Sequence, residues 1–362
     1  MKILLICLTS NQIVTFRKSL IERFQSDGHD VYAITFDDEQ RELVESRGVK
    51  LFCVNGSNRS LNPFKILTLR KEYQKIIEEV NPDIVFTFML KPNIFGVRAA
   101  KKAGVNKIFS MVEGAGDVFI NNGIKWKMIR YVICKMYRRS FRYSNKVVFL
   151  NNDDKAEFIA RKLVKEEQCE IVSGIGVDLE RFEYRPMKND RTFIMIARML
   201  RTKGVLEYCK AARIVKQQYP DAVFNYLGAE GTLKVSDIQE YIDDGIINYL
   251  GTTKDVRPYF EDARVNVLPS YREGFGLVNA EAGAIGRPTI TCDTVGSRDT
   301  VTNGYNGFLV NVGDYEALAE KIIWCIEHPD EVEEMGKNSR KMAEEKFNVN
   351  VINDKLINII FG

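Results

Sequence analysis

Residues 273–290 read Glu-Gly-Phe-Gly-Leu-Val-Asn-Ala-Glu-Ala-Gly-Ala-Ile-Gly-Arg-Pro-Thr-Ile. This order of residues predicts a glycine-containing turn, a helix that begins near Leu277, and then a buried strand. Gly274 and Gly276 carry no Cβ, so the backbone of the turn can approach a ligand closely. The free amides at the start of such a helix bind anions, a diphosphate included. The stretch therefore predicts an anion-binding helix start within an α/β fold.

Two glutamates stand eight positions apart in this stretch. Glu273 lies in the predicted turn and Glu281 about one turn into the helix. One carboxylate can therefore meet one end of an elongated polar ligand while the other meets a second part of it. Carboxylates beside a phosphate site usually bind hydroxyl-rich ligands. The alternative is a surface glutamate pair beside a glycine-rich connection, because the spacing alone is common by chance.

Strand and helix patterns alternate along the whole chain, which is typical of a doubly wound α/β protein. A helix closed by glycine is predicted at Thr15–Gly28 and an amphipathic last helix at Val349–Ile360. The predicted strands are Lys2–Leu8, Asp30–Thr35, Lys50–Val54, Asp83–Phe88, Lys107–Val112, Lys146–Leu150, Arg191–Ala197, Ala222–Leu227, Ile246–Leu250, Ala263–Leu268 and Pro288–Cys292.

The strands fall into two series, which predicts two Rossmann-like domains that face each other across a cleft. Residues 1–186 should form an N-terminal Rossmann-like domain and residues 187–346 a C-terminal one. The segment Phe182–Asp190 contains Pro186 and several charges, so it is the predicted linker. In folds of this kind, ligands bind at the carboxyl ends of the strands.

The composition is that of an ordinary globular protein. With 362 residues, 45% of them hydrophobic and 28% charged, the chain can bury a core in each of two domains. A net charge of +3 argues against a nucleic-acid partner. Seven scattered cysteines without a Cys-x-x-Cys pair fit a reducing cytosol, and two histidines nearly exclude a histidine-based metal site. The apolar run Ile3–Leu8 is too short for a signal peptide or membrane span, so we expect neither.

A second run of interest is Ala197–Gly204, which follows a predicted strand and opens a helix. Arg198 can bind phosphate oxygens in a forked geometry, Lys203 can supply a point charge, and Arg201 is a weaker candidate. Cations at a helix start oppose the helix dipole unless an anion is bound, although ordinary surface cations remain the alternative. The sequence has neither an Asp-x-Asp motif nor an evident metal-ligand cluster, so we expect cations rather than a metal ion to stabilise a leaving group.

Together the two runs resemble the donor site of retaining, nucleotide-sugar-dependent glycosyltransferases of family 4, which have the GT-B fold. In that family the first glutamate of a Glu-x7-Glu signature holds sugar hydroxyls, the second holds the ribose, and the amides between them contact the diphosphate and sugar. The resemblance implies that Glu281 binds the ribose. It also implies a set of further donor-site residues, namely Glu273, Phe275, Gly276, Leu277 and Val278.

The same resemblance assigns roles elsewhere in the chain. Arg198 and Lys203 match an arginine and a lysine that face the diphosphate in the family and neutralise charge as the nucleotide leaves. Leu250 ends a predicted strand at the point where the family reads the nucleobase with backbone groups, although an ordinary strand end is equally consistent. Residues 347–362 correspond to a helix that crosses back to the N-terminal domain.

Three patches in the N-terminal half follow predicted strands and are expected to bind the acceptor. Arg17 ends the run after the first strand, Lys91 and Asn93 follow the strand Asp83–Phe88, and Glu113 follows the next strand. Many family members have a histidine near the position of Glu113, close to the reacting sugar, so the glutamate is a departure. Glu113 could be a catalytic base or a hydroxyl ligand, or simply a solvated loop carboxylate.

Three short runs narrow the resemblance: Arg59–Phe64, Leu90–Asn93 and Val112–Gly114. Together they resemble a subgroup found in bacterial surface-glycan assembly, and the similarity extends over nearly the whole chain. Members of that subgroup act on polyprenyl-diphosphate-linked sugars, and several transfer N-acetylgalactosamine or a related hexose through an α linkage. The resemblance therefore implies a lipid-linked saccharide as the acceptor.

The segment Lys125–Tyr143 supports a lipid-linked acceptor on independent grounds, because it holds seven Lys or Arg residues and no Asp or Glu. A basic amphipathic helix of this kind suits an anionic membrane surface, so we expect a cytoplasmic protein that binds peripherally to the inner face of the cell membrane. Packing of the apolar side into the domain core is the alternative, and the two are compatible. The residues predicted to share that apolar side are Trp126, Ile129, Ile133, Met136 and Tyr137.

The resemblance implies transfer from a UDP-hexose or UDP-N-acetylhexosamine with retention of configuration, and it needs no protein nucleophile. A glycogen-type synthase acting on a soluble acceptor and a non-catalytic UDP-sugar-binding protein remain open. A nucleotide-sugar epimerase would need acid/base histidines that His29 and His328 hardly provide. An NAD-dependent enzyme is discounted, since Thr9–Gln12 stands where a Gly-x-Gly-x-x-Gly loop would follow the first strand.

Overall fold

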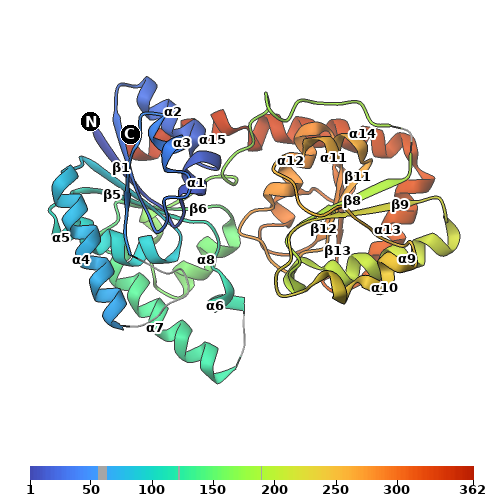
Figure 1. Cartoon of the computed structure of the whole chain (residues 1–362), viewed down its shortest axis with the longest axis horizontal. Helices are drawn as coiled ribbons and strands as arrows, with labels where there is room; N and C mark the ends of the chain where they lie inside the picture. The colour runs from blue at the N-terminus through green and yellow to red at the C-terminus, as the bar shows by residue number, and fades with distance from the viewer. Residues whose placement is uncertain (56–62, 121–122, 189) are drawn as a thin grey trace. The chain divides into compact units, whose positions relative to one another are not determined.

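The computed structural model describes residues 1–55, 63–120, 123–188 and 190–362 (Figure 1). These residues form two compact units, unit 1 with Met1–Val172 and Asn353–Gly362, and unit 2 with Ser173–Ile352. The end of the last helix therefore clusters with the N-terminal unit. The predicted boundary at residue 186 lies inside unit 2.

Unit 1 is built on a parallel sheet that has seven strands among the described residues, in the order β3-β2-β1-β4-β5-β6-β7. Parallel sheets covered on both faces are made from near-continuous apolar runs, and all five residues of β4 are buried. The strands are β1 (Lys2–Ile6), β2 (Asp30–Thr35), β3 (Lys50–Cys53), β4 (Ile84–Phe88), β5 (Lys107–Val112), β6 (Lys146–Phe149) and β7 (Cys169–Ile171).

Helices connect these strands and cover the sheet of unit 1 (Figure 1). Tyr137, Phe141, Phe149 and Phe158 form a buried aromatic cluster between the helices and the sheet. The helical elements are α1 (Ser10–Thr15), α2 (Lys18–Ser26), α3 (Arg41–Glu45), α4 (Pro63–Val80), η1 (Pro92–Gly96), α5 (Val97–Lys102), α6 (Asp117–Ile120), α7 (Ile124–Phe141), α8 (Asn152–Ala160), η2 (Glu166–Gln168) and α15 (Val349–Phe361).

Unit 2 has a second parallel sheet, with six strands in the order β10-β9-β8-β11-β12-β13 within the described ranges. The strands are β8 (Thr192–Ile196), β9 (Val223–Leu227), β10 (Asn248–Tyr249), β11 (Val265–Leu268), β12 (Thr289–Cys292) and β13 (Gly307–Val310). The helical elements are η3 (Arg201–Lys203), α9 (Val205–Gln218), η4 (Val235–Asp237), α10 (Gln239–Asp243), α11 (Arg257–Asp262), α12 (Leu277–Ile285), η5 (Arg298–Thr300), α13 (Tyr315–Glu327), α14 (Pro329–Met342) and η6 (Ala343–Phe347).

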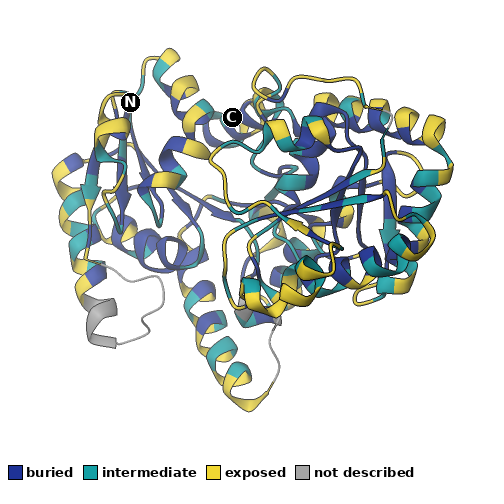
Figure 2. Cartoon of the chain, turned by 45° about the vertical axis from the view of Figure 1, so that its right-hand side comes forward, coloured by how far each residue is buried: buried dark blue, intermediate teal, exposed yellow. Residues whose placement is uncertain are grey.

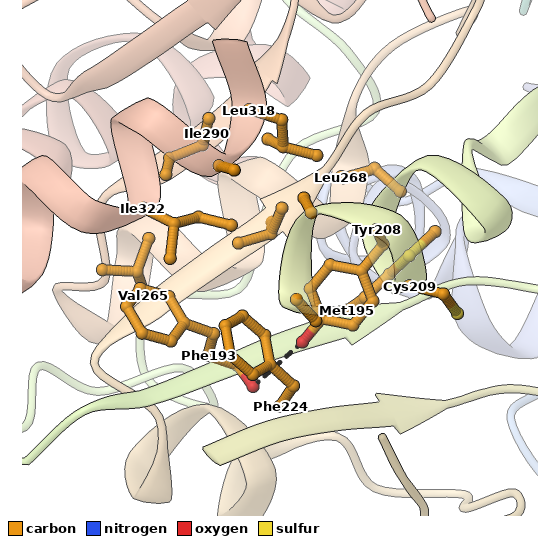
Figure 3. Close-up of a cluster of buried hydrophobic side chains, with 14 of the residues drawn as sticks. Phe193, Met195, Tyr208, Cys209, Phe224, Val265, Leu268, Ile290, Leu318 and Ile322 are labelled. Carbon is orange, nitrogen blue, oxygen red and sulfur yellow. Dashed lines mark hydrogen bonds between the residues drawn. The ribbon is translucent and has the colours of Figure 1, made fainter. Parts of the chain in front are cut away.

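The core of unit 2 lies between this sheet and the helices that pack on it (Figure 3). The rings of Phe193 and Phe224 stack with centroids 5.2 Å apart, and Tyr208 from α9 packs edge-on against Phe224. The buried Tyr208 hydroxyl donates a hydrogen bond to the carbonyl of Phe193 at 3.1 Å, so this polar group is satisfied. The packing fixes α9, and with it the loop that precedes α9, on the sheet.

The strand predictions agree with the structure except at the edges of the sheets. The short edge strands β7 and β13 are not predicted from the sequence, because runs of three or four residues carry little periodicity. The predicted helix Thr15–Gly28 is wrong at its start, since the chain forms α1 and then α2, with Arg17 between them. Gly28 does follow the second helix with a positive φ of 79°, as a closing glycine should.

The segment predicted as a linker is bound to unit 2 by a fully buried arginine. Arg287 donates hydrogen bonds to the carbonyls of Arg185 and Pro186 at 2.6 and 3.3 Å, and to those of Phe260 and Glu261 at 2.9 and 3.1 Å. Burial lowers the pKa of Arg287 to about 10, which still leaves it charged at neutral pH. A buried cation with several carbonyl acceptors holds these segments together, so the linker prediction is wrong for this part of the chain.

Candidate functional site

The strand order of unit 2 places two loops at one point of its sheet. β8 pairs with β9 on one side and with β11 on the other, so the connections leave in opposite directions from these neighbouring strands. In doubly wound sheets this switch point, at the carboxyl ends of the strands, is where ligands bind. Ala197–Gly204 follows β8 and Pro269–Gly276 follows β11. These are the two runs predicted from the sequence, and the fold brings them together.

An ion pair joins the two loops. Lys203 Nζ lies 2.6 and 2.7 Å from the two carboxylate oxygens of Glu273, and the side chains are 23% and 12% exposed. Lys203 ends a 3₁₀ turn that is closed by Gly204 in the left-handed conformation, with φ 75°. A Cβ at Gly204 would stand 2.2 Å from the carbonyl oxygen of Pro269, so only glycine allows the loops to approach this closely.

Backbone hydrogen bonds between the loops fix the position of Glu273. The amide of Tyr271 and the hydroxyl of Ser270 both donate to the carbonyl of Thr202, at 2.9 and 3.1 Å. The amide of Glu273 donates to the carbonyl of Val295, in the loop after β12, at 2.9 Å. Three loops at the carboxyl edge therefore hold one carboxylate in place before any ligand binds.

Helix α12 begins directly after this loop. Gly276 is its N-cap residue, and no side chain caps the first turn, which also lacks acidic residues. The amide dipoles at such a start favour an anion. Glu281 lies on α12, and burial raises the pKa of its carboxyl to about 7, with the charge of Arg181 opposing the shift. Among the described residues, no hydrogen bond or ion pair engages the Glu281 carboxylate, so this group is available to a ligand.

Of the other predicted donor residues described next, all are exposed or partly exposed except Phe275, which is buried. Arg198 is exposed and has no side-chain partner in the described part of unit 2, so its guanidinium is free to move. Leu250 is 37% exposed at the end of β10, and Leu277 and Val278 are partly exposed in the first turn of α12. Phe275 differs from the expectation, because its ring is buried against Phe347. The Phe275 side chain therefore packs the loop rather than extending toward a ligand.

Unit 1 has an equivalent switch point between β1 and β4, where a buried ion pair lies. Arg17, between α1 and α2, pairs with Glu113, which follows β5, and the two side chains are 3% and 13% exposed. The Arg17 guanidinium also lies over the ring of Phe88, 4.1 Å from its centroid, and against the thiol of Cys7. Burial lowers the pKa of Arg17 to about 10 and raises that of Cys7 to about 12. The burial of Arg17 favours a role in positioning Glu113 over the predicted acceptor contact.

The residues after β4 are also more buried than the sequence predicts. Lys91 is 6% exposed, and burial lowers the pKa of its ammonium group. Asn93 is fully buried: its amide donates to the carbonyl of Met111 at 2.8 Å and accepts from the hydroxyl of Thr87 at 2.7 Å. These bonds favour a structural role for Asn93 over the predicted acceptor contact. Met89 has a φ of 69°, an uncommon conformation that marks the start of this turn.

The predicted membrane-facing segment forms α7 and the two residues after it. Ile133 and Tyr137 are buried in the core of unit 1, and Trp126, Ile129 and Met136 are partly buried. The predicted apolar side therefore faces the core, as the alternative interpretation expected. The part of the Arg59–Phe64 run before Pro63 lies outside the described residues.

No helix in the described ranges is long and apolar enough to cross a membrane. No group of three or more His, Cys, Asp or Glu side chains there could hold a metal ion.

Family comparisons agree with the two-unit architecture. Residues 177–342 match the family described as "Glycosyl transferases group 1", and residues 2–151 match "Glycosyl transferase 4-like". The chain belongs to the glycosyltransferases. In this glycosyltransferase the group 1 match falls in unit 2, with the Lys203–Glu273 pair, and the 4-like match falls in unit 1, with the Arg17–Glu113 pair.

Two curated glycosyltransferases are similar over most of their length. The chain is 28% identical over 361 residues to N,N'-diacetylbacillosaminyl-diphospho-undecaprenol alpha-1,3-N-acetylgalactosaminyltransferase of Campylobacter jejuni, covering 96% of this chain and 95% of that protein. It is 27% identical over 320 residues to UDP-Gal:alpha-D-GlcNAc-diphosphoundecaprenol alpha-1,3-galactosyltransferase of Escherichia coli, covering 83% of this chain and 81% of that protein. Both relatives are named for transfer to undecaprenyl-diphosphate-linked sugars.

A solved structure is similar over the whole chain. Anabaena HepE in complex with UDP superposes with a TM-score of 0.80 at 19% identity, and the match covers 99% of each chain. The likeness confirms the GT-B fold that the sequence predicts.

Some supporting residues of the glycosyltransferase site are not predicted from the sequence. Gly296, with φ 74°, lets the loop after β12 approach so closely that a Cβ there would be 2.4 Å from the carbonyl oxygen of Glu273. The hydroxyl of Tyr271 donates to Glu207 of α9 at 2.9 Å. The sequence could have indicated Gly296, because a glycine that follows a predicted strand at the same edge of a sheet often permits close backbone approach. Nothing in the sequence pattern pointed to Tyr271.

Proposed function

We propose that this glycosyltransferase moves a hexose or an N-acetylhexosamine from a UDP-sugar to a polyprenyl-diphosphate-linked saccharide, with retention of configuration. The observation that carries the proposal is the Lys203–Glu273 ion pair at the switch point of unit 2, in the loop that leads into the uncapped start of α12. A cation, an oriented carboxylate and a helix start in one place fit a ligand that combines a diphosphate with sugar hydroxyls.

Each donor-side residue has a distinct role in this proposal. Lys203 and Arg198 neutralise the diphosphate together with the first-turn amides of α12, so no metal ion is required for the departing charge. Glu273 accepts hydrogen bonds from sugar hydroxyls, and Glu281 accepts them from the ribose. The backbone near Leu250 contacts the base. Uracil as that base is supported by the relative that is named for UDP-Gal as its donor.

The chemistry needs no nucleophile from the protein. The bond between the anomeric carbon and the diphosphate oxygen breaks, and its electron pair stays with the diphosphate of UDP. The acceptor hydroxyl attacks from the face that the leaving group vacates, and a phosphate oxygen of the departing diphosphate takes the hydroxyl proton. The new glycosidic bond therefore has the anomeric configuration of the donor.

Acceptor recognition is assigned to unit 1. Both curated relatives described above are named for undecaprenyl-diphosphate-linked acceptors, and they match nearly the whole chain or four fifths of it. Glu113 binds an acceptor hydroxyl, Arg17 orients Glu113, and Lys91 adds positive charge at the same edge of the sheet. Peripheral contact with the anionic inner face of the cell membrane, through Lys125–Tyr143, brings the enzyme to such an acceptor.

The test is a transfer assay with a panel of UDP-sugars and a synthetic polyprenyl-diphosphate monosaccharide, followed by mass spectrometry. One added hexose or N-acetylhexosamine is expected, and Glu273→Ala and Lys203→Ala should abolish it without unfolding the protein. The anomeric coupling constant of the product, measured by NMR, tests retention. Near-normal turnover in either variant would contradict the donor site.

The other possible results of the transfer assay distinguish an error in the donor site from an error in the acceptor. No product with tight UDP binding would keep the donor site and overturn the lipid-linked acceptor, and a panel of soluble glucans would then test a glycogen-type synthase. Tight UDP binding without transfer to any acceptor would favour a binding protein.

A further inference from the structure

In unit 1, three arginines lie near a fourth, Arg98. Arg98 lies on α5, which contacts both α4 and α7. Arg70 lies on α4, Arg139 on the last turn of α7, and Arg142 is the C-cap residue of α7. Arg98 is partly buried, and its pKa is lowered first by burial and then by the charges of Arg70, Arg139 and Arg142. Each of these three arginines is therefore near enough to Arg98 for the two positive charges to repel each other.

These arginines have no anionic partner in the part of unit 1 that the structure describes. No hydrogen bond or ion pair engages any of the four guanidinium groups there. The neighbouring Arg138 shows the usual alternative, because it donates to the carbonyls of Lys162 and Arg161 at 2.8 and 2.9 Å. Repulsion within the cluster would be relieved by an anion that accepts hydrogen bonds from several guanidinium groups, as a phosphate does.

The outward face of α7 adds a second, independent feature. Its first two turns expose large apolar side chains that follow helical spacing: Ile124 at 80%, Met128 at 67%, Tyr131 at 70% and Val132 at 53% exposed. Figure 2 shows this part of α7 as mostly exposed. The same helical face continues with Lys135, Arg139 and Arg142, since residues three, four or seven positions apart share a side. The opposite face buries Ile133, Tyr137 and Phe141.

One face of α7 is thus apolar in its first half and cationic in its second half, where Arg98 and Arg70 widen the positive surface. An exposed apolar stripe next to unpaired cations fits neither free solvent nor a nucleic acid, which has no apolar layer to receive such side chains. Both halves fit the boundary of a phospholipid leaflet, where phosphates lie directly above acyl chains.

We propose that Arg70, Arg98, Arg139 and Arg142 form a binding site for the phosphate groups of anionic phospholipids. The Ile124–Met128–Tyr131–Val132 stripe enters the headgroup region beside it. The inference rests on the membrane contact of the proposed function and replaces the side chains predicted for it, because the predicted apolar side faces the core. Free phosphate and diphosphate share the chemistry of the site, so the test separates them from lipid.

The test measures co-sedimentation of the full chain with vesicles of phosphatidylcholine alone and with vesicles that also contain phosphatidylglycerol. The protein should bind the second kind only, and added salt should weaken binding. Arg98→Gln/Arg139→Gln should lower the apparent partition coefficient about tenfold or more, since two surface cations are removed. Met128→Ser/Tyr131→Ser should lower it at unchanged net charge. The matched control Lys107→Gln/Lys165→Gln removes two exposed cations of unit 1 elsewhere and should bind nearly as the parent does.

Two further experiments distinguish a lipid site from a site for free anions and from a failure of the proposed function. Inorganic pyrophosphate, tested by thermal shift on the parent and on Arg98→Gln/Arg139→Gln, detects a site for free anions; a shift that the substitution abolishes, without vesicle binding, overturns the lipid assignment. Equal vesicle binding by all variants, or none by the parent, overturns the inference as a whole. Transfer to a water-soluble diphosphate-linked acceptor, measured on the same variants, should be unchanged. If the parent itself transferred no sugar to this acceptor, the result would count against the proposed function and not against the lipid site.

Discussion

Lys203 and Glu273 form a bidentate contact in which the ammonium nitrogen lies 2.6 and 2.7 Å from the two carboxylate oxygens. The two residues are 70 positions apart, and they meet because β8 and β11 are neighbours in the sheet. The pair keeps both charges satisfied when no ligand is bound. A diphosphate near Lys203 and sugar hydroxyls near Glu273 would each share this contact, so donor binding and the ion pair are coupled.

The first prediction concerns this coupling. Lys203→Met and Glu273→Gln should each lower kcat by about 100-fold or more, the effect expected when one pre-organised electrostatic contact to a developing charge is lost. Stability should fall by only about 1–2 kcal/mol, because the side chains are partly exposed. Steady-state kinetics and urea unfolding measure the two effects. If the losses in kcat from the single variants multiplied in the double variant, the two side chains would act independently and the coupling would be absent.

The second prediction concerns pH. Burial raises the pKa of Glu281 to about 7 from 4.5, so the folded protein binds this proton more tightly than the unfolded chain does. Its contribution to stability is fully present below pH 4.5 and is lost as the pH rises through about 7. Glu281→Gln removes the titration and should be more stable than the parent at pH 8, by on the order of 2 kcal/mol. Thermal unfolding between pH 5 and pH 8 tests this, and parallel curves for the two proteins would contradict it.

The same substitution separates stability from function. Glu281→Gln should raise the KM for the UDP-sugar because an amide is a weaker acceptor for ribose hydroxyls than a carboxylate. A more stable protein with weaker donor binding is the combination expected when a buried charge is retained for a ligand.

The third prediction tests the close approach of the two loops. Gly204→Ala places a Cβ 2.2 Å from the carbonyl oxygen of Pro269 and also demands a left-handed alanine. Gly245→Ala is the matched control, since Gly245 has a φ of 66° but nothing within 4 Å of its added Cβ. The control should cost about 1 kcal/mol of stability, and Gly204→Ala should cost at least about 1 kcal/mol more. Equal losses, or an unchanged affinity of Gly204→Ala for UDP, would show that the loops can separate freely.

The sequence predicts most of this fold because buried parallel strands are continuous apolar runs. β2 and β5 have the predicted bounds, and the others differ by one or two residues, apart from the missed edge strands. The donor loops are also predictable, since both follow strands at the same edge and carry glycine beside charged residues. What periodicity cannot supply is the partner of each side chain. Nothing in the order of residues indicates that Lys203 would meet Glu273.

In unit 1, the limit of what the sequence can predict is clearer. Polar residues that follow strands were all expected to face a ligand, yet Asn93 is fully buried and bonded to Met111 and Thr87. On α7 the helical wheel identified an apolar side correctly, but a wheel does not say which side meets the core. Ile124 and Tyr131 are exposed because the other face is already filled by Ile133 and Tyr137. The burial of Asn93 and the exposure of Ile124 and Tyr131 both follow from tertiary packing, which one sequence does not report.

The fourth prediction concerns metal removal. Arg198 and Lys203, with the start of α12, are proposed to carry the negative charge of the leaving diphosphate. Transfer should therefore continue at an unchanged rate in EDTA, and added Mg²⁺ or Mn²⁺ should not raise kcat. A rate that falls in EDTA and returns with a divalent cation would contradict the role given to these two side chains.

The fifth prediction concerns the buried pair of unit 1. Arg17→Met leaves the Glu113 carboxylate, only 13% exposed, without its cation, which should cost about 3–5 kcal/mol. Arg17→Met/Glu113→Met removes both charges and should recover a large part of that loss, because the site then holds apolar groups beside Phe88 and Cys7. Glu113→Gln tests function separately: it should lower kcat for the lipid-linked acceptor while UDP affinity is unchanged. Additive stability losses in the double variant would mean that the two charges do not interact, and Arg17 would then have no role in placing Glu113.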